Sequence, residues 1–200
     1  MLTLFHVPKS RSSTIVWLLG ELGVPYETKV VEIRRADGSG ARDPANPHPH
    51  GKVPCLQHDG QRVFEIAAIT LYLTDLFPQA KLGPRVGEPL RGEYLSWLAY
   101  RPGVLEPSLM MRRLNVKHVQ GGMGWAEAAE VEEVLNEALS RRQYLLGDEF
   151  SAADISVGGT VNLLMSFNLM NETPAFKDYA ARISSRPAFR RMMERDGAAP

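Results

Sequence analysis

The chain has 200 residues, 44% of them hydrophobic and 23% charged, which is the composition of an ordinary soluble globular protein. Its 23 Lys and Arg balance its 23 Asp and Glu, so the sequence argues against a general affinity for nucleic acid or an anionic membrane. No apolar run approaches the roughly 20 residues of a membrane span, and MLTLFHVPKS lacks the features of a signal peptide. Cys55 is the only cysteine, which excludes an intrachain disulfide and argues against a structural zinc cluster. We therefore expect a cytoplasmic protein.

The first third of the chain has the pattern of a mixed α/β domain. Residues 2–7 predict a short strand, and residues 10–22 predict a helix with one apolar stripe. Gly23 and Pro25 end this helix, and residues 26–33 predict a second strand. A strand, helix and strand of this length imply a right-handed crossover and a parallel pair.

A long loop and a hairpin follow. Glycines and prolines between residues 36 and 50 predict the loop, and VPCLQHDGQRVFE predicts a hairpin that turns at Asp59-Gly60. Residues 66–77 then predict a helix. The order βαβ followed by ββα is that of a thioredoxin-like domain, which we place at residues 1–78.

The remainder of the chain contains no convincing strand and predicts an all-helical domain. A linker rich in Gly and Pro covers residues 79–88, and the helical domain covers residues 89–200. SAADI matches the Ser-x-x-Asp capping box that begins a helix. The expected helices are residues 90–116 with a kink at Pro102-Gly103, residues 125–146, one from residue 151, and two short ones after Pro174 and Pro187.

Several segments together resemble the glutathione S-transferase superfamily. They occur in the expected order and spacing over nearly the whole chain, as HPHGKVPCL (48–56), FEIAAITLYL (64–73), YLLGDEFSAADISVG (144–158) and RISSRPAFRRM (182–192). SRSSTIVWLLGELGVPYE (10–27) looks like the serine-containing bacterial and fungal branch. The resemblance implies a homodimer that binds glutathione as co-substrate, without a metal, and transfers its thiolate to a small hydrophobic electrophile.

The resemblance also implies a glutathione-binding site around the hairpin. Pro54 resembles the family's cis-proline, which leaves the N–H and C=O of Val53 to pair with the ligand's cysteinyl backbone. Glu65 would hold the α-amine, and the N-terminus of the helix from Ile66 would hold the adjacent carboxylate. The family usually has Glu-Ser at this point, so Ile66 removes one hydroxyl contact to that carboxylate.

Other residues near the hairpin have less specific roles in this comparison. Lys52 lies where the family often holds the glycyl carboxylate, with His50 and Arg42 as further candidates. The alternative for His50 is a solvated loop residue, and Glu65, taken alone, is equally consistent with an acid that stabilises its own helix. We expect Cys55 to be a buried, inert thiol at the start of a strand.

The serines before the first helix are candidates for activating the glutathione thiol. The first strand offers no tyrosine, so an acidifying hydroxyl has to come from Ser10, Ser12 or Ser13. Ser10 is our first candidate, Ser12 the second, and Ser13 an expected cap. The alternative is that all of them are capping hydroxyls and the backbone at the helix N-terminus favours the thiolate.

The electrophile site is expected in the helical domain near residues 100–114. Met110 and Met111 have flexible thioethers that suit a tolerant apolar pocket, although a Met pair at helical spacing is more often part of a core. Two alternatives to conjugation stay open. One is glutathione-dependent peroxide or disulfide reduction, and the other is a non-catalytic regulator that keeps the fold for protein contacts.

Overall fold

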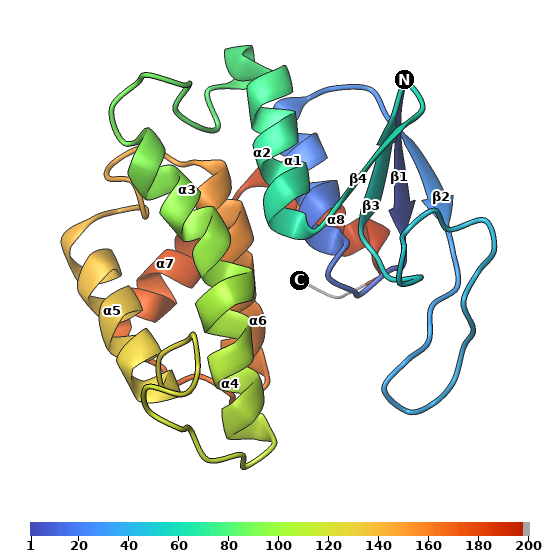
Figure 1. Cartoon of the computed structure of the whole chain (residues 1–200). Coiled ribbons are helices and arrows are strands. Elements are labelled where there is room, and N and C mark those ends of the chain that lie inside the picture. The colour runs from blue at the N-terminus through green and yellow to red at the C-terminus, as the bar shows by residue number, and fades with distance from the viewer. Residues whose placement is uncertain (198–200) are drawn as a thin grey trace. The chain divides into compact units, whose positions relative to one another are not determined.

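The computed structural model describes residues 1–197, which form two compact units. The first unit contains Met1–Ala80 and the segment from Arg186 onward, and the second contains Lys81–Ser185. Figure 1 labels the elements of both. Among the described residues, none of the helices combines the length and the apolar character that a membrane span requires.

A four-stranded mixed sheet forms the centre of the first unit. The strands lie in the order β2-β1-β3-β4, with β1 parallel to β2 and β3 antiparallel to both β1 and β4. All five residues of the central strand β1 are buried, which explains its run of apolar residues. The strands are β1 (Leu2–His6), β2 (Glu27–Val30), β3 (Cys55–His58) and β4 (Gln61–Phe64).

This sheet and its connections confirm the predicted thioredoxin-like arrangement. The parallel pair is joined through helix α1 (Ser13–Leu22), and the hairpin turns at Asp59-Gly60. Both turn residues have a positive φ, 47° and 81°, which a two-residue hairpin of the right-handed twist requires. Helix α2 (Ile66–Leu76) follows the hairpin directly.

Helix α1 begins three residues later than the sequence predicts. Ser10, Arg11 and Ser12 form a turn in which the N–H of Ser13 donates to the carbonyl of Ser10 at 3.0 Å. Serine hydroxyls compete with helical backbone bonds, and here they bond back to the end of β1. The helix ends as predicted at Gly23, whose φ of 66° closes the last turn.

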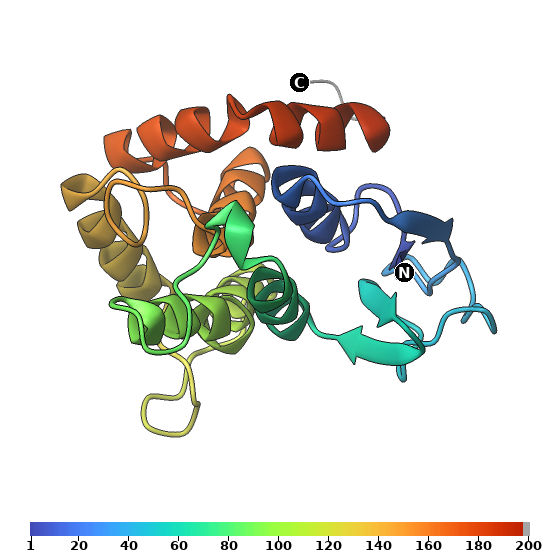
Figure 2. The ribbon, with the colours of Figure 1, turned by 90° about the horizontal axis from the view of Figure 1, so that it is seen from above.

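The last helix of the chain, α8 (Pro187–Arg195), belongs to the first unit and packs on α1. Figures 1 and 2 show the two helices side by side. The rings of Trp17 and Phe189 meet edge to face with centroids 4.9 Å apart. Gly20 permits this approach, since a Cβ there would lie 3.3 Å from that of Ala188. The sequence-based range of 89–200 for the helical domain includes α8, and the expected domain ranges stay predictions.

The second unit is helical, which confirms the predicted fold class of an α/β domain followed by an all-helical one. Within residues 81–185 the only β pairing is an isolated bridge between Tyr144 and Gly147. The expected kink at Pro102-Gly103 is a π-helical segment between two α-helices. The helices are α3 (Arg91–Tyr100), η2 (Arg101–Leu105), α4 (Glu106–Arg113), α5 (Ala128–Arg141), η3 (Asp154–Gly158), α6 (Gly159–Ser166) and α7 (Pro174–Ser184).

The predicted capping box in SAADI is present and extends into a buried network. The N–H of Ala153 donates to Ser151 Oγ at 3.3 Å, and the N–H of Ser151 donates to Asp154 at 2.8 Å. Asp154 is fully buried and also accepts from the N–H of Leu145 at 2.9 Å and the hydroxyl of Tyr179 at 2.8 Å. One carboxylate therefore joins the turn before the helix, its first turn and α7.

We expect Asp154→Ala to lower the free energy of unfolding by at least about 3 kcal/mol. The substitution removes the acceptor of four buried donors, and each one left unpaired costs about 1 to 3 kcal/mol. Asp178→Ala is the matched control, because this carboxylate is exposed on α7 and should change stability by less than about 0.5 kcal/mol. Urea unfolding of the three proteins measures the difference, and a loss below about 1 kcal/mol for Asp154→Ala contradicts the expectation.

Candidate functional site

The serine run lies at the end of β1, where Ser12 is completely buried. Its Oγ accepts a hydrogen bond from the N–H of Val7 at 3.1 Å. The same oxygen lies 2.7 Å from His6 Nδ1 and 2.7 Å from Ser10 Oγ. Ser12 has no exposed surface, and these partners of its hydroxyl are protein groups.

Ser10 is half-buried, as is Ser13, whereas Ser12 has no exposed surface. Ser10 Oγ lies 2.7 Å from the carbonyl oxygen of Val7, to which it can donate. The N–H of Ser12 also donates to Ser10 Oγ, at 3.2 Å. The hydroxyl of Ser13 instead donates to the carboxylate of Asp196. Ser10 therefore combines a partly exposed hydroxyl with a bond to the buried Ser12.

His6 and Asp196 complete this cluster, and the sequence analysis gave neither of them a role. Both side chains are almost fully buried, and His6 Nε2 lies 3.2 Å from Asp196 Oδ1. The N–H of Lys9 donates to the other oxygen of Asp196 at 3.0 Å. Burial lowers the pKa of His6 from its ordinary value, an effect that the charge of Asp196 opposes and that of Arg195 supports. The only local signal was that His6 ends the first strand beside the serines.

The segment before β3 contains the expected cis-proline. The peptide bond between Val53 and Pro54 is cis. Val53 is buried and packs in one apolar cluster with Val7, whose carbonyl accepts from Ser10. Within residues 1–197 the N–H and C=O of Val53 form no hydrogen bond with protein groups. The serine run is therefore joined, through Val7, to the apolar cluster that also contains Val53.

Cys55, which follows the cis-proline, is buried as predicted, and its surroundings disfavour the thiolate. Its side chain has no exposed surface, and burial raises the pKa of its thiol to about 11. A thiol with this pKa is almost entirely protonated at neutral pH. Any thiol chemistry at this site must therefore use a sulfur that comes with a ligand.

The loop before the cis-proline is held by polar side chains. Arg42 Nη2 donates to the carbonyl of Pro49 at 2.9 Å, and Asn46 Nδ2 donates to the carbonyl of Lys52 at 3.0 Å. Gly51 has a φ of 61°, and a Cβ there would lie 2.6 Å from the Arg42 side chain, so only glycine fits. This geometry leaves the side chains of Lys52 and His50 exposed.

A buried histidine, His48, connects this loop to the start of α2. Its Nδ1 accepts from the N–H of His50 at 3.1 Å, and its ring packs against Phe64 at 5.5 Å between centroids. Burial lowers the pKa of His48. The charge of Glu65 opposes this lowering, whereas the charges of His50, Lys52 and Arg62 add to it. The structure thus brings the predicted residues His50, Lys52 and Glu65 into one electrostatic neighbourhood.

Glu65 stands at the N-terminus of α2 in a strained conformation. Its φ is 70°, which is rare for a residue with a Cβ, and its side chain is exposed and caps no backbone group. Strain of this kind is usually found at functional positions. Ile66 is half-buried and begins the helix, whose first N–H groups have no side-chain cap.

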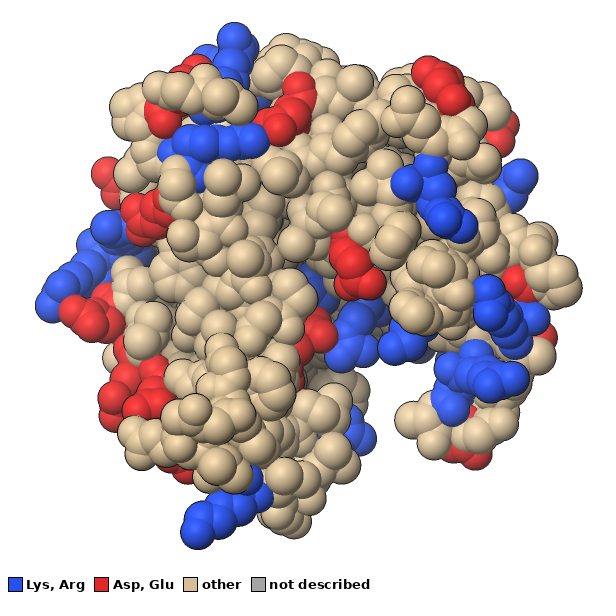
Figure 3. Space-filling view, in the orientation of Figure 1, with Lys and Arg blue, Asp and Glu red and all other residues tan. Residues whose placement is uncertain are grey.

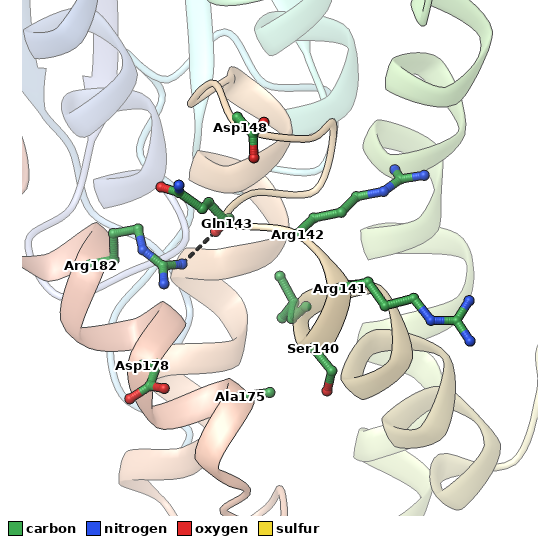
Figure 4. Close-up of a pocket in the computed structure, with 9 residues that line it drawn as sticks. Ser140, Arg141, Arg142, Gln143, Asp148, Ala175, Asp178 and Arg182 are labelled. Carbon is green, nitrogen blue, oxygen red and sulfur yellow. Dashed lines mark hydrogen bonds between the residues drawn. The ribbon is translucent and has the colours of Figure 1, made fainter.

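The predicted electrophile residues lie on α4 in the second unit. Met110 is 40% exposed, whereas the sulfur of Met111 accepts from Trp125 Nε1 at 3.2 Å, which ties it to packing. Neither methionine lines a hollow of about 450 Å³ in this unit, formed by the end of α5 and by α7. Figure 4 shows that hollow, where Arg182 donates to the carbonyl of Gln143 and Arg142 points away to pair with Glu93.

Two family models match this chain. Residues 10–76 match the N-terminal domain of glutathione S-transferase, and residues 126–187 match its C-terminal domain. Among curated proteins, glutathione S-transferase 3 of Schizosaccharomyces pombe is 30% identical over 174 residues, which are 77% of this chain and 70% of the relative.

Solved structures give the same result for the fold. A glutathione transferase from Methylococcus capsulatus is 26% identical, with a TM-score of 0.78 over 98% of this chain and 99% of that one. A sphingomonad glutathione S-transferase, crystallised in complex with glutathione, is also 26% identical, with a TM-score of 0.78 over 98% and 100% of the two chains.

Proposed function

Since the chain belongs to the glutathione S-transferase family, we propose that it conjugates the thiolate of glutathione to small apolar electrophiles in the cytoplasm. The observation that carries this proposal is the position of Ser10. Its hydroxyl is half-buried, and it is bonded to Val7, which packs in one cluster with Val53. If the cysteinyl backbone of glutathione pairs with Val53, the thiol of that residue would lie near the Ser10 hydroxyl.

The proposed glutathione site uses the groups that the fold leaves unpaired. The backbone of Val53 pairs with the cysteinyl residue, as a short added strand after Pro54. Glu65 holds the α-amine, and the uncapped N–H groups at the start of α2 hold the neighbouring carboxylate. Lys52 and His50 hold the glycyl carboxylate as exposed cations or donors. The complex of the sphingomonad relative with glutathione supports this ligand.

The chemistry needs a thiolate, because the neutral thiol is a weak nucleophile. A free thiol of pKa about 8.5 is only about 3% ionised at pH 7. In this proposal Ser10 Oγ donates a hydrogen bond to the sulfur and stabilises its negative charge. The thiolate then attacks an electrophile held by the second unit, where Met110 and Met111 stay our candidates for pocket residues.

The direct experiment is retention on immobilised glutathione, followed by turnover with aryl halides and hydroperoxides. Conjugation with release of halide supports the proposal, and peroxide turnover alone favours the reductase alternative. Retention without any turnover favours a glutathione-binding regulator. A failure to bind glutathione overturns the proposal.

Ser10→Ala is the variant that tests the thiolate role in the same assay. Turnover should fall by about ten- to a thousandfold, because one charge-assisted donor to the reacting atom is lost. Affinity for glutathione should change much less. The pKa of the bound thiol should rise, as measured by the ultraviolet absorbance of the thiolate at about 240 nm. Ser13→Ala is the control, since its hydroxyl bonds to Asp196 and lies outside the predicted ligand position. Equal effects of the two variants would show that Ser10 has no special role.

Ile66→Ser tests where the α-carboxylate binds. If this carboxylate lies on the N-terminus of α2, the new hydroxyl adds one hydrogen bond to a charged group, worth about 1 kcal/mol after competition with water. Glutathione should bind about fivefold more tightly, as measured by calorimetric titration well below the melting temperature. A folded variant that binds several-fold more weakly would place the carboxylate elsewhere.

We also propose that the protein is a homodimer, the two-fold assembly most common among oligomers and expected from its family. Sedimentation equilibrium at micromolar concentration should give about twice the 22.2 kDa mass of one chain. A mass equal to that of one chain would contradict the dimer.

A further inference from the structure

Four side chains form a continuous line of hydrogen bonds from the surface into the core of the first unit. Ser10 Oγ lies 2.7 Å from Ser12 Oγ, and Ser12 Oγ lies 2.7 Å from His6 Nδ1. The line ends where His6 Nε2 lies 3.2 Å from Asp196 Oδ1. Ser10 is half-buried and the other three are buried, so only one end of this serine–histidine chain meets solvent.

The carboxylate of Asp196 sets the direction of these hydrogen bonds. A carboxylate only accepts, and this one also accepts from the N–H of Lys9 and the hydroxyl of Ser13. His6 must therefore carry its proton on Nε2, which leaves Nδ1 as an acceptor. Ser12 then donates to Nδ1 and offers its lone pairs to Ser10 and to the N–H of Val7.

This direction leaves the surface end of the chain ready to accept a proton. The single proton of Ser10 has two acceptors at 2.7 Å, the carbonyl of Val7 and Ser12 Oγ, and its oxygen accepts from the N–H of Ser12 at 3.2 Å. When Ser10 donates inward to Ser12, one lone pair of its oxygen is left for a donor from outside. A ligand thiol beside Ser10 is such a donor. The geometry points to His6 as the group that takes the proton of the bound glutathione thiol, through the hydroxyls of Ser12 and Ser10.

The transfer conserves both hydroxyls. The S–H proton passes to Ser10 Oγ, the Ser10 proton to Ser12 Oγ, and the Ser12 proton to His6 Nδ1. The S–H bond breaks with its electron pair left on sulfur, and His6 becomes an imidazolium beside the carboxylate of Asp196. The bonds among His6, Ser12 and Ser10 now point outward, while Nε2 still donates to Asp196, so Ser10 donates to the thiolate. The same chain of hydrogen bonds therefore removes the thiol proton and, after its bonds reverse, stabilises the thiolate.

The charges around His6 fit this role. Asp196 favours the imidazolium, whereas burial and Arg195 favour the neutral ring that is needed before the transfer. Arg195 lies over the ring of Tyr26 and donates to its hydroxyl at 2.8 Å. In the sheet, Val30 of β2 lies beside His6. The cation of β2, Lys29, lies over the ring of Phe5. The turn before α1 presents the uncharged Ser12.

This inference rests on the proposed function, and a wild-type measurement separates the two. Nitrogen-15 NMR reports the protonation of His6 in the free protein, with glutathione and with S-methylglutathione, which has no ionisable thiol. We expect the imidazolium to be more populated with glutathione at the same pH. If neither ligand binds, the proposed function fails. If both bind and His6 responds equally, the relay is wrong and the function stands.

His6→Asn gives a kinetic test with a readout that loss of packing would not produce. The amide keeps a partner for Ser12 but cannot take up a proton. At pH 7, kcat/KM for conjugation should fall by up to about thirtyfold, because a thiol without a base is only about 3% ionised. Above about pH 9 the rate should approach that of the wild type, since hydroxide then removes the proton. KM for glutathione should change less than about twofold.

Ser39→Ala serves as the control, because its hydroxyl is exposed and bonds to Asp37, outside the serine–histidine chain. Its pH profile should follow the wild type. A His6→Asn profile that is lowered equally at every pH, or not lowered at all, overturns the relay. If His6→Asn fails to fold, Ser12→Ala interrupts the same chain and should give the same pH-dependent loss.

Discussion

The carboxylate of Asp196 is the group on which the N-terminal turn depends. It accepts hydrogen bonds from the ring of His6, the backbone of Lys9 and the hydroxyl of Ser13. Lys9 has a φ of 57°, a conformation that a residue with a Cβ rarely adopts without support. A single buried anion therefore holds the strand end, the turn and the start of α1 in one arrangement. Ser10 and Ser12 take their positions from this arrangement.

Strain and small residues shape the opposite edge of the candidate site. Glu65 keeps a positive φ that costs about 1 to 3 kcal/mol, and the hairpin before it and the helix after it hold it there. Gly51 has no side chain, which leaves room for Arg42 to pack against its backbone. Both features place side chains outward, namely Glu65 at the helix start and Lys52 beside the cis-proline. The loop is thus built to present polar groups and not to fill the core.

Local signals predicted much of this structure, because they involve neighbours in the sequence. The hairpin turn follows from Asp59-Gly60, and the capping box follows from the spacing of Ser151 and Asp154. The start of α1 did not follow, since the serines that predict a cap bond back to β1 instead. The pairing of His6 with Asp196 joins residues 190 positions apart, and no periodicity or spacing encodes such a contact. Burial of Ser12 likewise becomes visible only when the strand, the turn and α8 are packed together.

The packing of α8 on α1 has a consequence for how the protein is made. A ribosome releases the chain from its N-terminus, and domains made first usually fold first. Here the sheet, α1 and the serine turn emerge well before Asp196 and the helix that covers Trp17. Until α8 and Asp196 emerge, His6 lacks its carboxylate and the apolar face of α1 lacks its cover. The first unit therefore reaches its final form only when this later segment of the chain packs back onto it.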